Sequence, residues 1–283
     1  MRKQLLSAIA ALITATTSMA ATTIDPANSS AYSANTGWIN AEGDVANGAE
    51  IGQAFCAGNM YGANVGWIHL GDGSPGNGMA YGNASGSDYG VNHDGLGNLT
   101  GYAYGANIGW INFEQTYGKP KVNLTTGNLS GYAWGANVGW INLTGVSTLT
   151  LGTGPDVDGD GLPDAWEYGH TATLGTLNGG DADDDGVSDL DEYLADTDPL
   201  DADDYLRITD FEAQNSTNTI TWPIKTTRLY RLQHATALST GMSWTTTSTP
   251  FIPSSGPDVT ETVSGVTDAQ RFYRVQAKPP LSP

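Results

Sequence analysis

Short runs in which hydrophobic and polar residues alternate, separated by turn residues, make up most of the chain. In one such stretch residues 129–135 alternate, Ala136-Asn137 supplies a turn, and residues 138–143 return as a second run. Alternation with a period of two is typical of β-strands, and Asn tolerates the backbone conformation of a tight turn. The pattern predicts a β-hairpin and, because similar runs fill the chain, a mainly β protein.

This hairpin is the last of four copies of one string: aromatic, small, Ala, Asn, any residue, Gly, Trp, Ile, then Asn or His. The copies read YSANTGWIN, YGANVGWIH, YGANIGWIN and WGANVGWIN, and they begin at Tyr32, Tyr61, Tyr104 and Trp134. Such recurrence indicates a repeat domain, over residues 21–150. With a preceding strand at 121–125 (KVNLT), the last copy forms a three-stranded meander, which is too small to be stable alone.

The register of the hairpin decides which side chains enter the core. With Ala136-Asn137 as a two-residue loop, Trp134 lies opposite Gly139. The more apolar face, and therefore the expected core face, then carries Tyr132, Trp134, Ile141 and Leu143. The opposite face carries Trp140 and Asn142.

A Trp followed two residues later by Asn or His recurs on this second face in every copy. The pairs are Trp38 and Asn40, Trp67 and His69, Trp110 and Asn112, and Trp140 and Asn142. The simpler interpretation is that the indoles are buried between stacked repeats, because repeat units need a repeated core residue. The alternative is a carbohydrate-binding face, because an indole beside hydrogen-bonding groups suits a sugar ring. Four buried indoles would remove the second interpretation.

Residues 205–278 contain six more candidate strands. They cover residues 206–211, 217–222, 228–234, 243–247, 259–263 and 271–277. Several short strands at this spacing are typical of a β-sandwich of the fibronectin type III kind. We therefore expect a C-terminal β-sandwich.

Charge divides the chain more sharply than hydrophobicity does. The net charge is -19, and residues 156–204 hold 17 acidic residues without a single Lys or Arg. The rest of the chain is close to neutral, which excludes nucleic-acid binding through a basic patch. So dense an anionic segment repels itself unless cations bind in it.

The acidic segment, residues 155–204, contains two twelve-residue metal loops: DVDGDGLPDAWE and DADDDGVSDLDE. Both have acids at positions 1, 3, 5, 9 and 12, glycine at position 6 and an aliphatic residue at position 7, which is the EF-hand pattern for calcium. Position 7 contributes only its backbone carbonyl. The predicted ligands of two Ca²⁺ ions are Asp156, Asp158, Asp160, Leu162, Asp164 and Glu167 in the first loop, and Asp181, Asp183, Asp185, Val187, Asp189 and Glu192 in the second. Short helices are expected from about Asp164 and over residues 189–195.

These loops resemble the thrombospondin type 3-like calcium repeats of secreted bacterial proteins, which usually precede a terminal β-sandwich. The resemblance implies structural calcium and an extracellular multidomain protein, and it implies no chemistry. The hairpin half resembles GWIN-type repeats of bacterial surface proteins, which carry no activity over to this chain. Dockerins also pair such loops, but typically with Asp at position 12, where this chain has Glu167 and Glu192.

The first twenty residues are typical of a secretory signal peptide, with Arg2 and Lys3 before a short apolar run and a small-x-small cleavage site ending near Ala20. We therefore expect a secreted or cell-surface protein without a transmembrane segment in the mature chain. Cys56 is the only cysteine, which excludes an internal disulfide and favours a buried apolar role.

Three function classes follow from these features. The favoured one is a non-catalytic, calcium-binding extracellular protein, structural or adhesive, with glycans or cell-surface proteins as partners. The second is a carbohydrate-binding protein that uses the repeated Trp/Asn face. The third is a secreted polysaccharide-active enzyme, which would need two facing carboxyl groups drawn from residues such as Asp88, Asp94 and Glu114.

Overall fold

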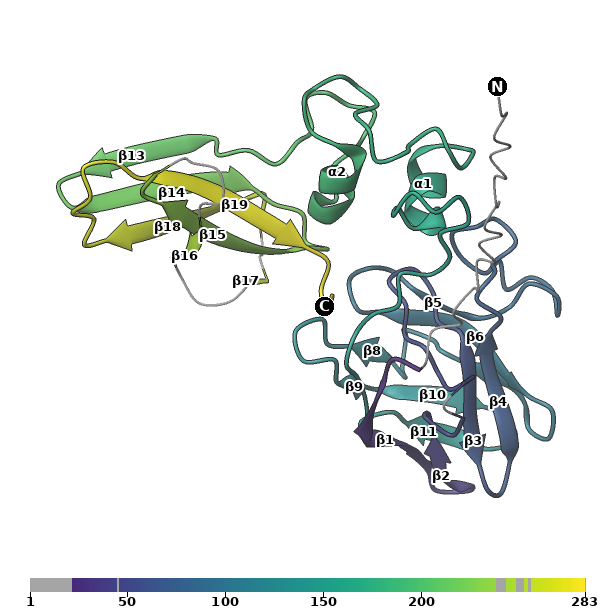
Figure 1. The fold of residues 1–283 in the computed structure, drawn as a ribbon. Helices are drawn as coiled ribbons and strands as arrows, with labels where there is room; N and C mark the ends of the chain where they lie inside the picture. Colours follow the sequence, from purple (N-terminus) through teal and green to yellow (C-terminus); the bar gives the residue numbers. More distant parts are fainter. Residues whose placement is uncertain (1–21, 45, 238–242, 248–251, 254–255, 283) are drawn as a thin grey trace, which may run out of the picture.

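The computed structural model describes residues 22–44, 46–237, 243–247, 252–253 and 256–282, and the predicted signal peptide at 1–20 lies outside them. A barrel-like β domain, a segment with two short helices and a second β domain follow one another along the chain (Figure 1). The mainly β fold that the alternation predicts is confirmed.

Eight antiparallel strands form the wall of the first domain. In order along the sheet they are β11 (Gly139–Asn142), β10 (Tyr132–Gly135), β7 (Gly109–Asn112), β6 (Leu99–Gly105), β4 (Gly66–Gly71), β3 (Gly58–Gly62), β2 (Gly37–Asn40) and β1 (Ile24–Ser33). Strand β1 also pairs with β11, so the sheet closes into a barrel. Two short strands extend this sheet, β5 (Val91–His93) beside β6 and β12 (Val146–Thr148) beside β1.

The predicted three-stranded meander of the last copy forms only in part. Residues 121–125 form a strand only over β8 (Lys121–Val122), which pairs with β9 (Leu129–Ser130) in a separate two-stranded sheet. In the barrel wall each copy of the string contributes one two-stranded hairpin, and the next hairpin supplies its pairing edge. The short third strands, β5 in the third copy and β8 in the last, pair only with the start of the hairpin that follows them.

The predicted hairpin register is wrong by one residue. Gly135 pairs with Gly139, so the loop has three residues, and Trp134 lies opposite Trp140. Gly139, the first residue after the loop, has φ +74°, a left-handed conformation that glycine adopts without strain. Because side chains alternate between faces, this shift moves Tyr132 and Trp134 from the expected core face to the exterior.

The barrel interior is aliphatic. Each hairpin turns its Ile inward beside a small residue or Met from the partner strand, and the four isoleucines are at most 4% exposed: Ile39, Ile68, Ile111 and Ile141. Cys56 is fully buried in the same core, as predicted, and burial raises the pKa of its thiol to about 12. The core thus comes from the smaller residues of the repeat and leaves its large rings outside.

The Asn in each turn joins neighbouring hairpins into a closed ring. Its side-chain amide donates a hydrogen bond to a turn carbonyl of the preceding hairpin: Asn64 to Thr36 at 2.9 Å, Asn107 to Val65 at 3.1 Å, Asn137 to Ile108 at 2.9 Å, and Asn35 to Val138 at 3.2 Å. The left-handed position belongs to the following Gly and not to this Asn. The Asn of the repeat therefore acts through its side chain, which hydrogen-bonds one hairpin to the next.

The C-terminal domain consists of two small sheets. One has the order β13 (Asp210–Gln214), β14 (Thr217–Pro223) and β18 (Asp258–Ser264); the other joins β16 (Thr245–Thr246), β15 (Leu229–Ala235), β17 (Ile252–Pro253) and β19 (Phe272–Lys278). Trp222 and Ile220 from the first sheet pack with Tyr230, Leu232 and Ala277 from the second, so the sheets form the expected sandwich.

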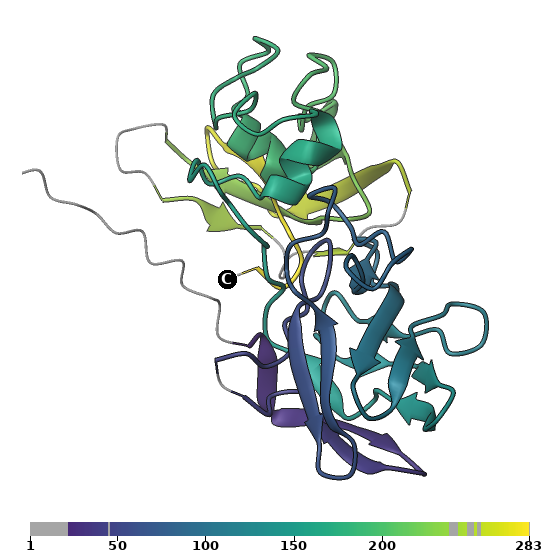
Figure 2. The same ribbon diagram turned by 90° about the vertical axis from the view of Figure 1, so that its right-hand side faces the viewer.

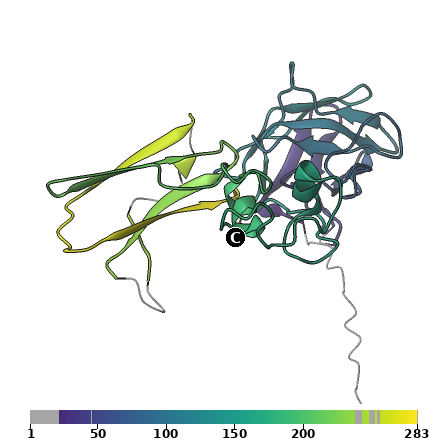
Figure 3. The same cartoon turned by 90° about the horizontal axis from the view of Figure 1, so that it is seen from above.

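Helices α1 (Asp164–His170) and α2 (Asp189–Ala195) lie between the two β domains (Figures 1 and 3), in the places that the sequence predicts. They pack around a small core of Leu162, Leu177 and Tyr193. Figure 2 places this segment and its acidic loops at the end of the molecule opposite the hairpins of the barrel. No helix in the part of the chain that the structure describes is long and apolar enough to cross a bilayer.

Candidate metal centre and exposed aromatic surface

Three carboxylates converge in each acidic loop. One ligand oxygen from each of Asp156, Asp158 and Asp160 lies within 4.8 Å of the others. The equivalent set in the second loop is Asp181, Asp183 and Asp185, with the same convergence. These are positions 1, 3 and 5 of the predicted loops. Unpaired carboxylates repel one another at this separation, so the arrangement suits a multivalent cation.

Glycine at position 6 allows both loops to fold in the same way. Gly161 has φ +96° and Gly186 has φ +93°, a backbone conformation that residues with a Cβ rarely adopt. The Gly161 N–H donates to Asp156 at 3.1 Å, and the Gly186 N–H donates to Asp181 at 2.9 Å. The backbone thereby wraps around the first carboxylate of each loop, as the sequence predicts.

A buried glutamate closes each loop at position 12. Glu167 and Glu192 are both 0% exposed. One oxygen of each accepts a hydrogen bond, from Gly175 N–H at 3.3 Å and from the Thr197 hydroxyl at 3.1 Å. The other oxygen, Oε2, has no hydrogen-bond partner in the described structure. A buried carboxylate oxygen without a partner is costly, and a bound cation would remove that cost.

The pKa values of these two glutamates also indicate that the loops suit a cation. Burial, then the neighbouring loop aspartates, raises the pKa of Glu167 to about 7, and the same causes raise that of Glu192 to about 7. No ion pair among the described residues reaches a carboxylate of either twelve-residue loop. The protein itself therefore supplies no positive charge to balance the loops.

The remaining predicted ligands have structural contacts of their own. Asp164 and Asp189, at position 9, accept hydrogen bonds from the backbone N–H groups of Val157 (2.8 Å) and Ala182 (3.0 Å), which tie the start of each loop to its helix. Leu162, at position 7, is fully buried in the core between the helices, while Val187 is half-buried. Neither side chain carries a ligand atom, which leaves the backbone carbonyl for that role.

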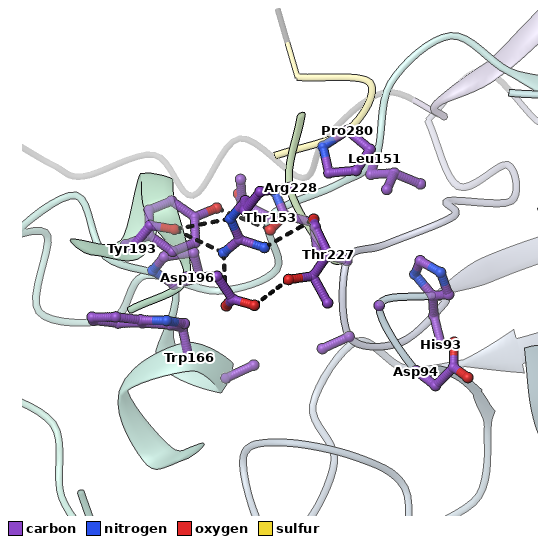
Figure 4. Close-up of a pocket in the computed structure, with 15 residues that line it drawn as sticks. His93, Asp94, Leu151, Thr153, Trp166, Tyr193, Asp196, Thr227, Arg228 and Pro280 are labelled. Atoms are coloured by element: carbon purple, nitrogen blue, oxygen red, sulfur yellow. Dashed lines mark hydrogen bonds and ion pairs between the residues drawn. The ribbon is translucent and has the colours of Figure 1, made fainter. Parts of the chain in front are cut away.

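The residue that follows the second loop, Tyr193, lies at a joint between all three parts of the molecule (Figure 4). Tyr193 follows Glu192 on α2; its hydroxyl donates to Gln53 of the barrel at 3.0 Å, and its carbonyl accepts from Arg228 of the sandwich at 2.7 Å. Arg228 also pairs with Asp196 at 3.1 Å. A cavity of about 320 Å³ at this joint is bordered by these groups and, across it, by His93 of the barrel.

The four repeat tryptophans lie on the surface of the barrel. Trp38 is 67% exposed, and Trp67, Trp110 and Trp140 are 42–48% exposed. Burial between stacked repeats, the simpler interpretation of the sequence, is therefore wrong. The physical reason is that the repeats pair edge to edge in one closed sheet, so the outer face of each hairpin has no neighbour above it.

Each tryptophan contacts a second aromatic ring. The sequence pattern predicts Trp134 on the core face and gives no role to the other three partner rings. The pairs Tyr32–Trp38, Tyr61–Trp67, Tyr104–Trp110 and Trp134–Trp140 have ring centroids 4.8–5.0 Å apart and interplanar angles of 58–60°. The aromatic first position of every string is the signal that could have revealed these partners. We call the exposed rings on the eight strands the aromatic band; they are Tyr32, Trp38, Tyr61, Trp67, Tyr102, Tyr104, Trp110, Tyr132, Trp134 and Trp140.

The carboxyl groups considered for catalysis are held by their own loops. Asp94 accepts from Leu96 N–H and Asn98, Glu114 from the N–H groups of residues 116–118, and Asp88 from Gly76 and Gly82. The hydrogen bonds lower the pKa of Glu114, and against the opposing effect of burial they also lower the pKa of Asp94. An acid catalyst needs the opposite shift, so Asp94 and Glu114 are suited to loop structure and not to proton donation.

No protein-family model, curated protein or solved structure matches this chain. What the loops and the aromatic band can do is therefore inferred from their own geometry.

Proposed function

We propose that this chain is a secreted, non-catalytic adhesive or structural protein in which two Ca²⁺ ions stiffen the segment between the barrel and the sandwich. The observation that carries the proposal is the pair of equivalent loops, each with three converging carboxylates and a fully buried glutamate whose second oxygen has no partner.

Calcium suits these loops better than other common cations. Ca²⁺ takes six to eight oxygen ligands, and each loop offers carboxylates and one backbone carbonyl in the order that a twelve-residue calcium loop uses. Mg²⁺ holds its own waters and prefers fewer protein carboxylates. The loops lack the Cys and His ligands that zinc favours.

The second loop links calcium to the arrangement of the domains. Glu192 and Tyr193 are adjacent on α2, so a cation held by Glu192 also fixes the residue that contacts both β domains. Without the cation, repulsion within the loop favours opening and loosens that helix. The ion would therefore stabilise the joint and not only the loop.

Calorimetric titration of the mature chain with Ca²⁺, after dialysis against EGTA, tests the proposal. We expect two bound ions and a higher melting temperature, since each site that is filled at a hundred times its dissociation constant adds about 2.7 kcal/mol to the free energy of unfolding.

Glu167→Gln and Glu192→Gln should each remove one site and its share of the stabilisation. Asp184→Asn is the matched control: it removes a charge from the second loop at position 4, where no ligand is expected, and Asn tolerates the φ of +63° found there. The proposal is wrong if the dialysed chain shows no thermal response to calcium, or if the control loses as much binding as Glu192→Gln.

A further inference from the structure

The aromatic band contains four equivalent units around the barrel. Each unit combines the two leaning rings of one hairpin with the Asn or His of the preceding hairpin, which pairs across the strands with the first of these rings. The units are Tyr32, Trp38 and Asn142; Tyr61, Trp67 and Asn40; Tyr104, Trp110 and His69; and Trp134, Trp140 and Asn112.

Two of the four units are covered by further rings or backbone. Tyr89 stands edge-on to Trp110 with centroids 4.9 Å apart, and its hydroxyl lies 3.0 Å from His69 Nδ1. At the fourth unit, the loop at Gly118 approaches so closely that a Cβ there would lie 3.1 Å from the Trp140 ring. These units are therefore partly filled by the protein itself.

One position in the strands distinguishes the open first unit from the third and fourth units. The residue two before the first ring is Tyr102 in the third unit and Tyr132 in the fourth, and each of these rings lies edge-on to the tryptophan of its unit. In the first unit the equivalent residue is Ser30, which pairs with Asn40 as Tyr132 pairs with Asn142. The small side chain leaves space beside Trp38.

That space is an open groove of about 430 Å³, lined by Ser30, Tyr32, Trp38, Asn142, Thr144 and Gly145. It holds an indole, a phenol and neutral hydrogen-bonding groups, and no carboxylate, amine or guanidinium lines it. Asn142 accepts a hydrogen bond from Thr144 N–H with its Oδ1, which orients its Nδ2 donor. The volume falls within the range of small-ligand sites.

The large exposed side chains on the outer surface of the barrel strands are of the kind that stacks on a sugar ring. Every exposed large hydrophobic residue on the eight strands is Tyr or Trp, whereas the Ile, Leu and Met residues of these strands are buried. In the groove at Trp38 a ring face lies next to neutral donors and acceptors, which matches the C–H face and the hydroxyl rim of a pyranose.

We propose that the groove at Trp38 binds a neutral hexopyranose unit of a polysaccharide, stacked on the indole and hydrogen-bonded by Asn142 and Ser30. This inference rests on the adhesive role proposed above and gives it a ligand class. The site lies on the barrel, in contact with neither calcium loop, so it can fail while the calcium sites stand.

The test is affinity electrophoresis and calorimetry of the calcium-loaded mature chain with hydroxyethylcellulose, laminarin and galactomannan, with polygalacturonate as an anionic comparison. We expect binding to at least one neutral polymer. Trp38→Ala and Ser30→Tyr should each weaken it at least about tenfold, since truncated aromatic anchors commonly cost that much.

Two control variants separate the groove from the fold and from the rest of the band. Ser30→Thr retains a small hydroxyl side chain and should bind normally. Trp110→Ala removes an indole that Tyr89 already covers and should also bind normally. Ser30→Tyr installs the residue that the equivalent strands already carry, so it is expected to fold.

Binding that persists in both Trp38→Ala and Ser30→Tyr overturns the groove as the site. Failure of all three neutral polymers, or binding of polygalacturonate alone, overturns the ligand class. Self-association that Trp38→Ala abolishes, without polymer binding, would assign the surface to a second copy of the chain and also refute the proposal. A normal calcium titration alongside any of these results leaves the proposed calcium role intact.

Discussion

Arg228 holds the joint between the helical segment and the sandwich, and its replacement should be the most damaging single change there. Arg228 is only 7% exposed, and its guanidinium lies 3.1 Å from the Asp196 carboxylate. The guanidinium also donates two hydrogen bonds to the Tyr193 carbonyl, from Nε at 3.2 Å and from Nη2 at 2.7 Å. Arg228→Met keeps much of the buried stem but leaves the carboxylate and the carbonyl without these donors.

The size of the effect follows from burial. Breaking a buried ion pair costs about 3–5 kcal/mol. The Asp196 side chain is 28% exposed and can recover some hydration, so the lower end applies, at about 3 kcal/mol. For a domain of this size, 1 kcal/mol corresponds to roughly 4–8 °C, so the sandwich transition should fall by roughly 12–24 °C.

Differential scanning calorimetry in saturating calcium measures this shift. Arg207→Met is the matched control, because Arg207 is exposed and lies over the Tyr205 ring, and its loss should change stability by no more than about 0.5 kcal/mol. Arg228→Lys should fall between the wild type and Met, since an ammonium lacks the planar fork. A loss below about 1 kcal/mol for Arg228→Met would refute the view that this pair stabilises the joint.

Three further predictions concern the barrel. Gly105→Ala should lower the free energy of unfolding by about 1–3 kcal/mol in urea, because the new Cβ would lie 2.7 Å from the Ile108 side chain. Gly86→Ala, with open space around it, should be close to neutral. Equal effects of the two substitutions would contradict this account of the packing. Asn137→Ala removes one of the four Asn hydrogen bonds between neighbouring turns and leaves the Ile108 carbonyl without its side-chain donor. The free energy of unfolding in urea should fall by about 0.5–1.5 kcal/mol. No change would mean that these hydrogen bonds contribute nothing to stability. His93 is buried with both ring nitrogens hydrogen-bonded to backbone, Nε2 as an acceptor, and burial lowers its pKa below 6.5 despite opposing contributions from the backbone and Asp94. The unfolded chain therefore binds the proton more readily, so the contribution of neutral His93 is complete above pH 6.5 and is lost as the pH falls below that value; the difference in unfolding free energy between wild type and His93→Gln should shrink on acidification to pH 5, and a constant difference would contradict the assignment.

Local chemistry was enough to predict how the two acidic loops fold. The spacing of carboxylates, the glycine at position 6 and the aliphatic residue at position 7 all lie within twelve residues, and the structure brings the first three carboxylates of each loop together as the spacing implies. The short helices were predictable for the same reason. The burial of Glu167 and Glu192, which leaves one oxygen of each without a partner, depends on packing around the loops.

The faces of the hairpins were not predictable in this way. Whether the loop has two or three residues is a local choice of small energy, yet it decides whether Trp134 lies opposite Gly139 or Trp140. Barrel closure then decided the exposure of every repeat tryptophan, because pairing between β1 and β11 joins residues more than a hundred positions apart. The amino-acid sequence by itself determined most of the strands, the repeated hairpins and the shape of the two acidic loops. Only the tertiary structure decided which side of each strand faces water, since that depends on neighbours supplied by distant parts of the chain.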